Sequence, residues 1–166
     1  MNKKTTALVK NLQLLMAKFN FPASSPIDPI FLNDLINHTS HDHLSKEMKK
    51  LIDEAAELLK SHPDFVYFLK IMDGFEFSGM ILYGFNNIEP SSQNFFIIND
   101  FYRHNDDFIN PDLAERLVLG EDGTSVFTYD TSKNQFQIRD RIGTENIYSS
   151  HDNFYNFLNE IIETVK

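Results

Sequence analysis

The sequence predicts an α+β fold, in which an antiparallel meander sheet of about five to six strands packs against N-terminal helices and one C-terminal helix. Through the first 72 residues, and again after residue 153, apolar side chains recur every three or four positions, which is the helical period. Between these regions, short aromatic and branched runs alternate with turn residues, which is typical of strands. Consecutive short strands without intervening helices pair in antiparallel order, so the middle of the chain predicts a meander.

Two helices are expected before residue 40. The first presents one apolar face, formed by Leu8, Leu12, Leu15, Met16 and Phe19. Pro22 and Pro26 end this helix. The second begins at Asp28 and Pro29, because aspartate is a favourable N-cap and proline suits the first helical turn, and it runs to residue 36.

Three further helices complete the helical part of the prediction. The helix over residues 44–59 has Ser45 as its N-cap. The next begins at Pro63 and ends at Asp73 and Gly74, because glycine readily adopts the left-handed conformation that terminates helices. The closing helix carries apolar residues at helical spacing, namely Phe154, Phe157, Leu158, Ile161, Ile162 and Val165.

The strands are expected between these helices. The predicted turn and strand segments cover residues 75–84, 95–98, 114–119, 125–129 and 135–139, with a short sixth strand at 147–148. Residues 130–134 form the predicted hairpin turn between the fourth and fifth strands, because aspartate, serine and asparagine favour turns.

Length and composition restrict the classes of protein. The chain has 166 residues, 42% of them hydrophobic, which is sufficient for one domain with a substantial core. It contains no cysteine, which excludes thiolate metal sites, cysteine nucleophiles and disulfides and fits a reducing compartment, with the cytoplasm as the expected location. There is no uninterrupted export signal, and no apolar run approaches the roughly 20 residues of a membrane span.

The charge distribution indicates the kind of partner. The net charge is −9, and because the first twenty residues contain four lysines and no acid, the rest of the chain carries −13. A domain with this negative charge repels nucleic acid and attracts basic proteins, although many ordinary cytosolic proteins are also acidic. The charge pattern implies no particular oligomeric state.

Short motifs occur between residues 63 and 84. A proline-led helix ends in Phe-Leu-Lys-Ile-Met-Asp-Gly-Phe, and Gly-Met-Ile-Leu-Tyr-Gly follows from residue 79. The motif positions are Pro63, Phe68, Leu69, Asp73, Gly74, Phe75, Gly79, Leu82, Tyr83 and Gly84. In these motifs the chain resembles the SUKH superfamily of Smi/Knr-like proteins, and within it the YrhA-like branch. Asp73 replaces the more usual asparagine of the family's turn, a mild departure because both residues bond to nearby backbone amides.

The resemblance covers roughly residues 44–165 and implies a single SUKH-like domain over residues 1–166, with residues 1–43 as a helical N-terminal extension. The motif residues are expected to be structural. Bacterial members are typically immunity proteins that bind and neutralise polymorphic toxins, often nucleases, whereas fungal relatives regulate cell-wall assembly. The resemblance therefore implies a non-enzymatic binding protein, and the alternative is a regulatory scaffold without a toxin partner.

Signals for catalysis are weak. His38, His41 and His43 could hold zinc or a similar metal, so a metal-dependent enzyme is a remote alternative function. The ordinary interpretation is that these histidines lie in a polar connector between two helices. Gly74 and Gly79 do not form a phosphate loop, because no Lys-Ser/Thr pair follows them and a strand, not a helix, comes next. The sequence contains no nucleophile elbow, so no catalytic residue, metal site or cofactor is predicted.

The partner-binding site is expected in an acidic stretch between residues 100 and 130, which has eight acids and two arginines. Carboxylates would steer a basic partner toward this stretch, and aromatic rings would anchor it. The ordinary alternative to a binding site is that the acids are solvated charges of surface loops and the aromatic rings point into the core. The candidate partner-binding residues are Asp100, Tyr102, Asp106, Asp107, Phe108, Glu121 and Asp122.

Overall fold

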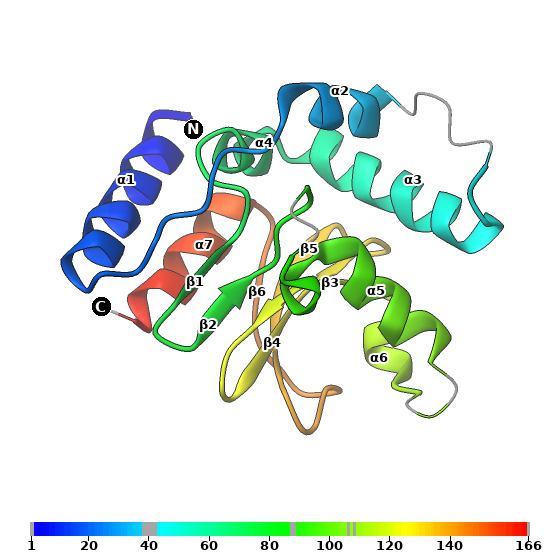
Figure 1. Ribbon diagram of the computed structural model, residues 1–166. Coiled ribbons are helices and arrows are strands. Elements are labelled where there is room, and N and C mark those ends of the chain that lie inside the picture. Colours follow the sequence, from blue (N-terminus) through cyan, green and yellow to red (C-terminus); the bar gives the residue numbers. More distant parts are fainter. Residues whose placement is uncertain (1, 38–42, 87–88, 106, 108, 166) are drawn as a thin grey trace.

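The computed structural model describes residues 2–37, 43–86, 89–105, 107 and 109–165 (Figure 1). The helices are α1 (Asn2–Lys18), α2 (Pro29–Asn37), α3 (Lys46–Ser61), α4 (Pro63–Leu69), α5 (Phe95–His104), α6 (Pro111–Ala114) and α7 (Phe154–Glu163), with a 3-10 turn at Ser91–Gln93. The strands are β1 (Phe75–Phe77), β2 (Met80–Leu82), β3 (Leu117–Glu121), β4 (Ser125–Asp130), β5 (Gln135–Asp140) and β6 (Ile147–His151). This arrangement confirms the predicted α+β class.

The sheet is an antiparallel meander in which β1 to β6 lie side by side in sequence order. Tyr129 lies opposite Phe136 in the register of β4 and β5. The predicted hairpin turn joins these strands, because Asp130 Oδ1 accepts hydrogen bonds from the amides of Ser132 and Lys133. Asn134 closes the turn with a φ of 56°, a left-handed conformation that asparagine tolerates.

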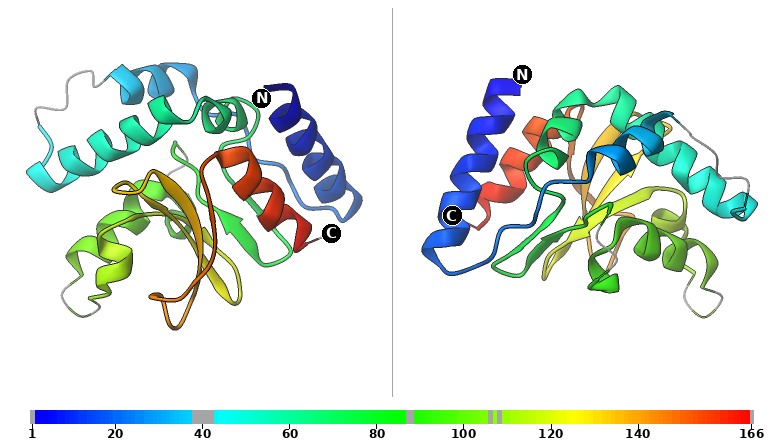
Figure 2. Two further views of the ribbon diagram at one scale, coloured as in Figure 1. Left: turned by 180° about the vertical axis from the view of Figure 1, so that it is seen from behind. Right: turned by 45° about the horizontal axis from the view of Figure 1, so that its top comes forward.

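Helices pack on opposite sides of the sheet. On one side, α7 packs against β5 and β6 and also contacts α1 and α4. On the other side, α5 and α6 pack against β3. Figure 2 shows α1 and α7 on the side of the molecule away from α5 and α6. None of the described helices combines the length and the hydrophobicity needed to cross a lipid bilayer.

Aromatic rings fill the core between α4, α7 and the sheet. The rings of Phe65 and Phe154 stack with their centroids 4.1 Å apart, and those of Phe136 and Phe157 stack at 5.4 Å. Such pairs contribute roughly 0.5–1.5 kcal/mol each beyond the burial of their area. The buried carboxylate of Asp64 accepts a hydrogen bond from the Tyr155 amide at 2.8 Å, which fixes the start of α7 to α4.

Helix α1 buries the face that its spacing predicts. Leu8, Leu12 and Met16 are at most 7% exposed, in contact with a core to which α4 and α7 contribute. Phe19 departs from the prediction, because α1 ends at Lys18 and the Phe19 ring is 55% exposed. Its nearest ring is that of Phe77, at 6.3 Å.

The motif residues between 63 and 84 form a tight backbone junction. The Asp73 carboxylate accepts hydrogen bonds from the amides of Phe85 at 2.7 Å and Asn86 at 2.9 Å. Gly74 has a φ of 76°, and a Cβ added to it would lie 2.6 Å from the Gly84 nitrogen. The two glycines are therefore required because two segments of backbone approach closely here. The motif side chains that pack in the core are Phe68, Leu69, Phe75, Leu82 and Tyr83.

One predicted strand is wrong. Residues 95–98 belong to α5, because the Asn94 side chain accepts a hydrogen bond from the Ile97 amide and so caps a helix. Phe95 and Asn99 are buried while Ile97 is exposed, which is the pattern of a helix with one face on the protein. The Phe-Phe-Ile-Ile run has strand propensity, but local capping and tertiary packing override it.

The third and sixth predicted strands have different bounds in the structure. The third predicted strand begins at Leu117 instead of residue 114, because Ala114 ends α6. The amide of Leu113 donates to the Asn110 side chain, which caps α6. The short sixth strand continues to His151, where it pairs with β5.

Candidate protein-binding surface

The structure places four of the seven predicted partner-binding residues on α5 and the β3–β4 turn. Asp100 and Tyr102 lie on α5, and Glu121 and Asp122 lie where β3 turns into β4. Asp107 is exposed in the segment after α5. Asp106 and Phe108 lie outside the described residues.

The carboxylate of Asp100 is at the surface of α5. It accepts a hydrogen bond from the His104 ring, with 2.9 Å between Oδ1 and Nδ1. The two side chains are 51% and 41% exposed, so water screens this pair and it adds little stability. The carboxylate therefore stays accessible to a partner.

The β3–β4 turn is fixed by its own acids. Asp122 Oδ1 accepts hydrogen bonds from the amides of Thr124 and Ser125, both at 2.7 Å. Arg141, from the end of β5, donates through Nη1 to the Asp122 carbonyl oxygen at 2.9 Å. Its Nη2 lies 3.5 Å from Glu121 Oε2. Arg141 thus ties the β3–β4 turn to the β5–β6 hairpin.

Two tyrosines are close enough to Glu121 to be influenced by its charge. Burial raises the pKa of the Tyr102 hydroxyl, and the Glu121 carboxylate raises it further, while Arg141 opposes this effect. Burial raises the pKa of Tyr83 well above its usual range, again with a contribution from Glu121. Both phenols therefore remain protonated at neutral pH, and the structure brings the predicted residues Tyr102 and Glu121 into one cluster.

Other acids of the stretch are paired within the protein. Arg116 Nε lies 3.3 Å from Asp130 Oδ2, and its Nη1 lies 3.6 Å from Asp112 Oδ1. The Asp130 side chain is only 5% exposed. The charge counted along residues 100–130 is therefore not all available at the surface. Asp107 and Glu115 are exposed, whereas Asp100, Glu121 and Asp122 are partly buried.

Exposed apolar residues lie on α5 and after it. Ile97 and Phe101 are four residues apart on the helix, and their side chains are 43% and 47% exposed. Ile109, in the segment that follows, is 78% exposed. A helical signal was present, because Asn94 precedes apolar residues at positions 95, 98 and 102.

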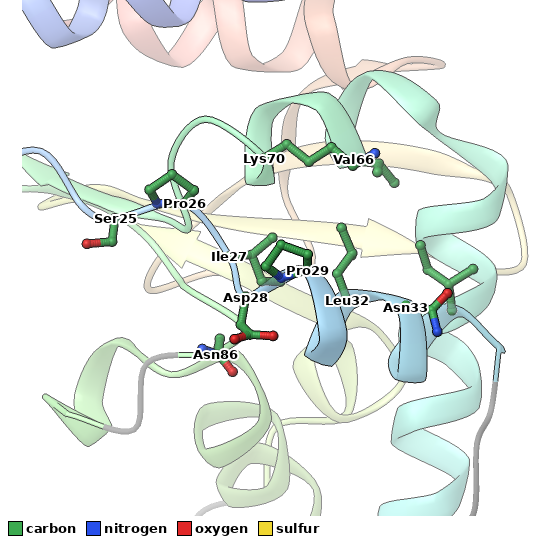
Figure 3. Close-up of a pocket in the computed structure, with 11 residues that line it drawn as sticks. Ser25, Pro26, Ile27, Asp28, Pro29, Leu32, Asn33, Val66, Lys70 and Asn86 are labelled. Atoms are coloured by element: carbon green, nitrogen blue, oxygen red, sulfur yellow. The ribbon is translucent and has the colours of Figure 1, made fainter.

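A cleft of about 730 Å³ opens between α2, the segment before it and the end of α4 (Figure 3). Figure 3 shows Val66 and Lys70 on one wall and Asp28 and Asn86 on the opposite side. The Asp28 carboxylate accepts hydrogen bonds from the amides of Ile30 and Phe31, so it serves as the N-cap of α2. Among the described residues that line this cleft there is no histidine and no second carboxylate, so they offer no acid–base pair.

The described residues contain no group of three or more His, Cys, Asp or Glu side chains that could hold a metal ion. Of the predicted histidine cluster, His43 is described and exposed, whereas His38 and His41 lie outside the described residues. The buried histidine is instead His62, whose Nε2 lies 3.1 Å from the Tyr129 hydroxyl. Its ring also contacts Phe136, so it joins the start of α4 to the β4–β5 hairpin.

Comparison with known proteins identifies a close sequence relative. The uncharacterized protein YrhA of Escherichia coli (strain K12) is 40% identical to this chain over 126 residues. The alignment covers 76% of this chain and 91% of the relative. No family model matches the chain, and no solved structure gives a significant match.

Proposed function

The chain belongs to the YrhA family, and we propose that it is a cytoplasmic, non-enzymatic protein-binding domain that neutralises a cognate toxin, often a nuclease in such systems, by direct binding. The resemblance of residues 63–84 to SUKH immunity proteins supports the toxin as the class of partner. The net charge of −9 supports a basic toxin domain, because opposite charges attract over long distances.

The observation that carries the proposal is the surface of α5, the segment after it and the β3–β4 turn, where exposed and partly exposed acids occur together with exposed apolar side chains. On α5, Asp100 lies one position from Phe101 and three from Ile97, both of which are exposed, and Asp107 is exposed in the segment that follows the helix. Around Tyr102, the Glu121 carboxylate adds a further charge. Carboxylates of this kind accelerate association with a basic protein, and apolar side chains retain it once bound.

Inhibition would follow from occlusion. One molecule of this protein covers the basic substrate-binding surface of one toxin domain, so no bond is made or broken and no cofactor is needed. Long-range attraction raises the association rate by roughly 10- to 1,000-fold at low salt. Slow dissociation then depends on the few apolar side chains buried in the complex.

The proposal is tested by affinity capture of the tagged protein from its own cells, with washes at low and then high salt. We expect a near-stoichiometric basic partner, such as the C-terminal domain of a large secreted protein. Expression of that domain alone should stop growth, and co-expression of this protein should restore it. A captured partner that does not harm cells would contradict the immunity role and favour a regulatory scaffold.

A further inference from the structure

Three large apolar side chains are exposed at one end of the sheet. Ile142 is 97% exposed, Tyr148 57% and Ile147 41%. All three belong to the β5–β6 hairpin or to the first residues of β6. Figures 1 and 2 show this hairpin and the β3–β4 turn at the same end of the sheet. Apolar residues that gather in this way, unlike single exposed ones, mark interaction sites.

The hairpin that carries Ile142 is a defined structure. The Arg141 amide donates to the Thr124 carbonyl oxygen at 2.9 Å, and the Ile142 amide donates to the Asp140 carboxylate at 2.9 Å. The Asn146 amide donates to the Gly143 carbonyl oxygen at 2.8 Å. Ile142 therefore projects from a turn that is already fixed, and a partner would bind it at little cost in conformational entropy.

Tyr148 is directed outward by a bulge. Ser149 lies opposite Ile138 and Ile147 lies opposite Arg139, which leaves Tyr148 as the extra residue of β6. A bulge of this kind turns a side chain away from its regular direction. The Tyr148 hydroxyl bonds to the Asp140 carboxylate, so its polar end is satisfied while its ring remains exposed.

The charges around these side chains select the partner. Residues 120–125 and 140–148 contain Glu121, Asp122, Asp140 and Glu145 and one basic residue, Arg141, a net charge of −3. Two copies of the protein would bring like charges together at this surface. A basic segment would instead meet complementary charge around an apolar centre.

We propose that residues 121–124 and 140–148, which we call the hairpin surface, dock a basic segment of a partner protein, with Ile142 and Tyr148 as its apolar anchors. The proposal rests on the proposed function and makes it more specific. It assigns the carboxylates of Glu121 and Asp122 to the same contact as Ile142 and Tyr148, which lie 20 to 27 positions farther along the chain. Arg141 links the two parts, because it bonds to the β3–β4 turn.

The test uses a double variant, Ile142→Ala with Tyr148→Ala. Its matched control is Leu14→Ala with Ile30→Ala, because those residues are 70% and 73% exposed on α1 and α2. The first probe is a synthetic octapeptide of alternating arginine and leucine, titrated into nitrogen-15-labelled protein. Chemical-shift changes should be confined to the hairpin surface and β6. The dissociation constant should rise at least about fivefold in the double variant and stay unchanged in the control, as expected for anchor residues.

The absence of shift changes in residues 121–124 and 140–148, or equal affinities of the two variants, would overturn the proposal. A dimer of the native protein that is lost in the double variant would also overturn it, because the surface would then bind a second copy.

The partner captured from cells is the second probe. If that partner binds both variants equally, the hairpin surface fails while the proposed function stands. If the peptide binds the hairpin surface but the captured partner is harmless to cells, the proposed function is wrong, while the assignment of the hairpin surface as a docking site remains.

Discussion

The side-chain amide of Asn99 exchanges two hydrogen bonds with the backbone of Val118. Asn99 Nδ2 donates to the Val118 carbonyl oxygen at 2.8 Å, and the Val118 amide donates to Asn99 Oδ1 at 2.7 Å. Strand β2 pairs with β3 at Gly120 and Glu121. Asn99 therefore bonds to the edge of β3 at Val118 as a neighbouring strand would, and it fixes α5 to the sheet.

Replacement of Asn99 by alanine should lower the free energy of unfolding by about 2–4 kcal/mol, because it leaves the buried amide and carbonyl of Val118 without partners. Urea unfolding followed by circular dichroism measures this change. Asn156→Ala is the control, because Asn156 is an exposed residue of α7. Equal unfolding midpoints for the two variants would show that the Asn99 bonds are unimportant.

The Gly84→Ala substitution should destabilise the protein by about 1–3 kcal/mol, because the added methyl group must be accommodated in close-packed backbone. Its Cβ would lie 2.7 Å from the Asp73 carbonyl oxygen. Gly123→Ala is matched to it, because a Cβ at Gly123 meets no atom within 4 Å. Thermal unfolding of both variants should show a lower Tm for Gly84→Ala alone, and a similar Tm for the two would contradict the close approach.

Leu12→Ala should cost about 2–5 kcal/mol of stability, the usual range for a buried leucine that leaves a cavity. Leu12 is 1% exposed on the inner side of α1, whereas Leu14 is 70% exposed on the same helix. Leu14→Ala should therefore leave the urea midpoint nearly unchanged. If the two alanine variants are equally stable, α1 is not part of the cooperative core.

Stability should decrease as the pH falls below about 6.5, the ordinary pKa of histidine. Burial lowers the pKa of His62, while Asp64 and the hydrogen bond to Asn134 partly oppose this effect. Below pH 6.5 the unfolded chain therefore binds a proton that the folded chain does not, which favours unfolding until the folded-state pKa is reached. Urea unfolding of the native protein and of His62→Gln at pH 7.5 and 5.5 measures the effect. The native protein should lose more stability than the variant, and equal losses would contradict the role of His62.

Neutralisation of the exposed Asp107 and the partly exposed Glu121 and Asp122 should slow association with the captured partner. In the Asp107→Asn, Glu121→Gln and Asp122→Asn triple variant we expect a lower association rate and a weaker dependence on salt, because fewer charges steer the encounter. The control removes the same charge from α3, with Glu47→Gln, Asp53→Asn and Glu57→Gln. Surface plasmon resonance at 50 and 300 mM salt distinguishes them. If both variants slow binding equally, net charge matters and the location of the acids does not.

The parts of the fold that could be predicted from the sequence are those with local signals. Helix α3 has an apolar face and a Ser45 cap, and the β4–β5 hairpin has a turn whose residues bond to their own backbone. Residues 95–98, the first four of α5, are instead predicted as a strand because they are apolar and have strand propensity. What selects the helix includes the Asn99–Val118 pair, and a contact across 19 residues is not visible in local spacing.

The candidate site could also be predicted only where the signal is local in the sequence. The acids at positions 121 and 122 could be identified from the sequence, but their pairing with Arg141 joins residues 19 and 20 positions apart and depends on strand register. The exposure of Ile142 was also not predictable, because an isolated isoleucine in a turn has no periodicity to reveal which way it faces. Because Arg141 comes from another strand and pairs with the β3–β4 turn, the charge counted along residues 100–130 overestimates the acidity of the surface.

The contact between α1 and α7 has a consequence for how the protein is made. Helix α1 leaves the ribosome before all other elements described here, yet part of its buried face is covered by α7, which leaves the ribosome after them. Leu8, Leu12 and Met16 therefore stay partly uncovered during translation of the intervening sheet. The nascent chain completes its native structure only after residues 154–163 have emerged, and until then its first helix is a candidate for chaperone binding.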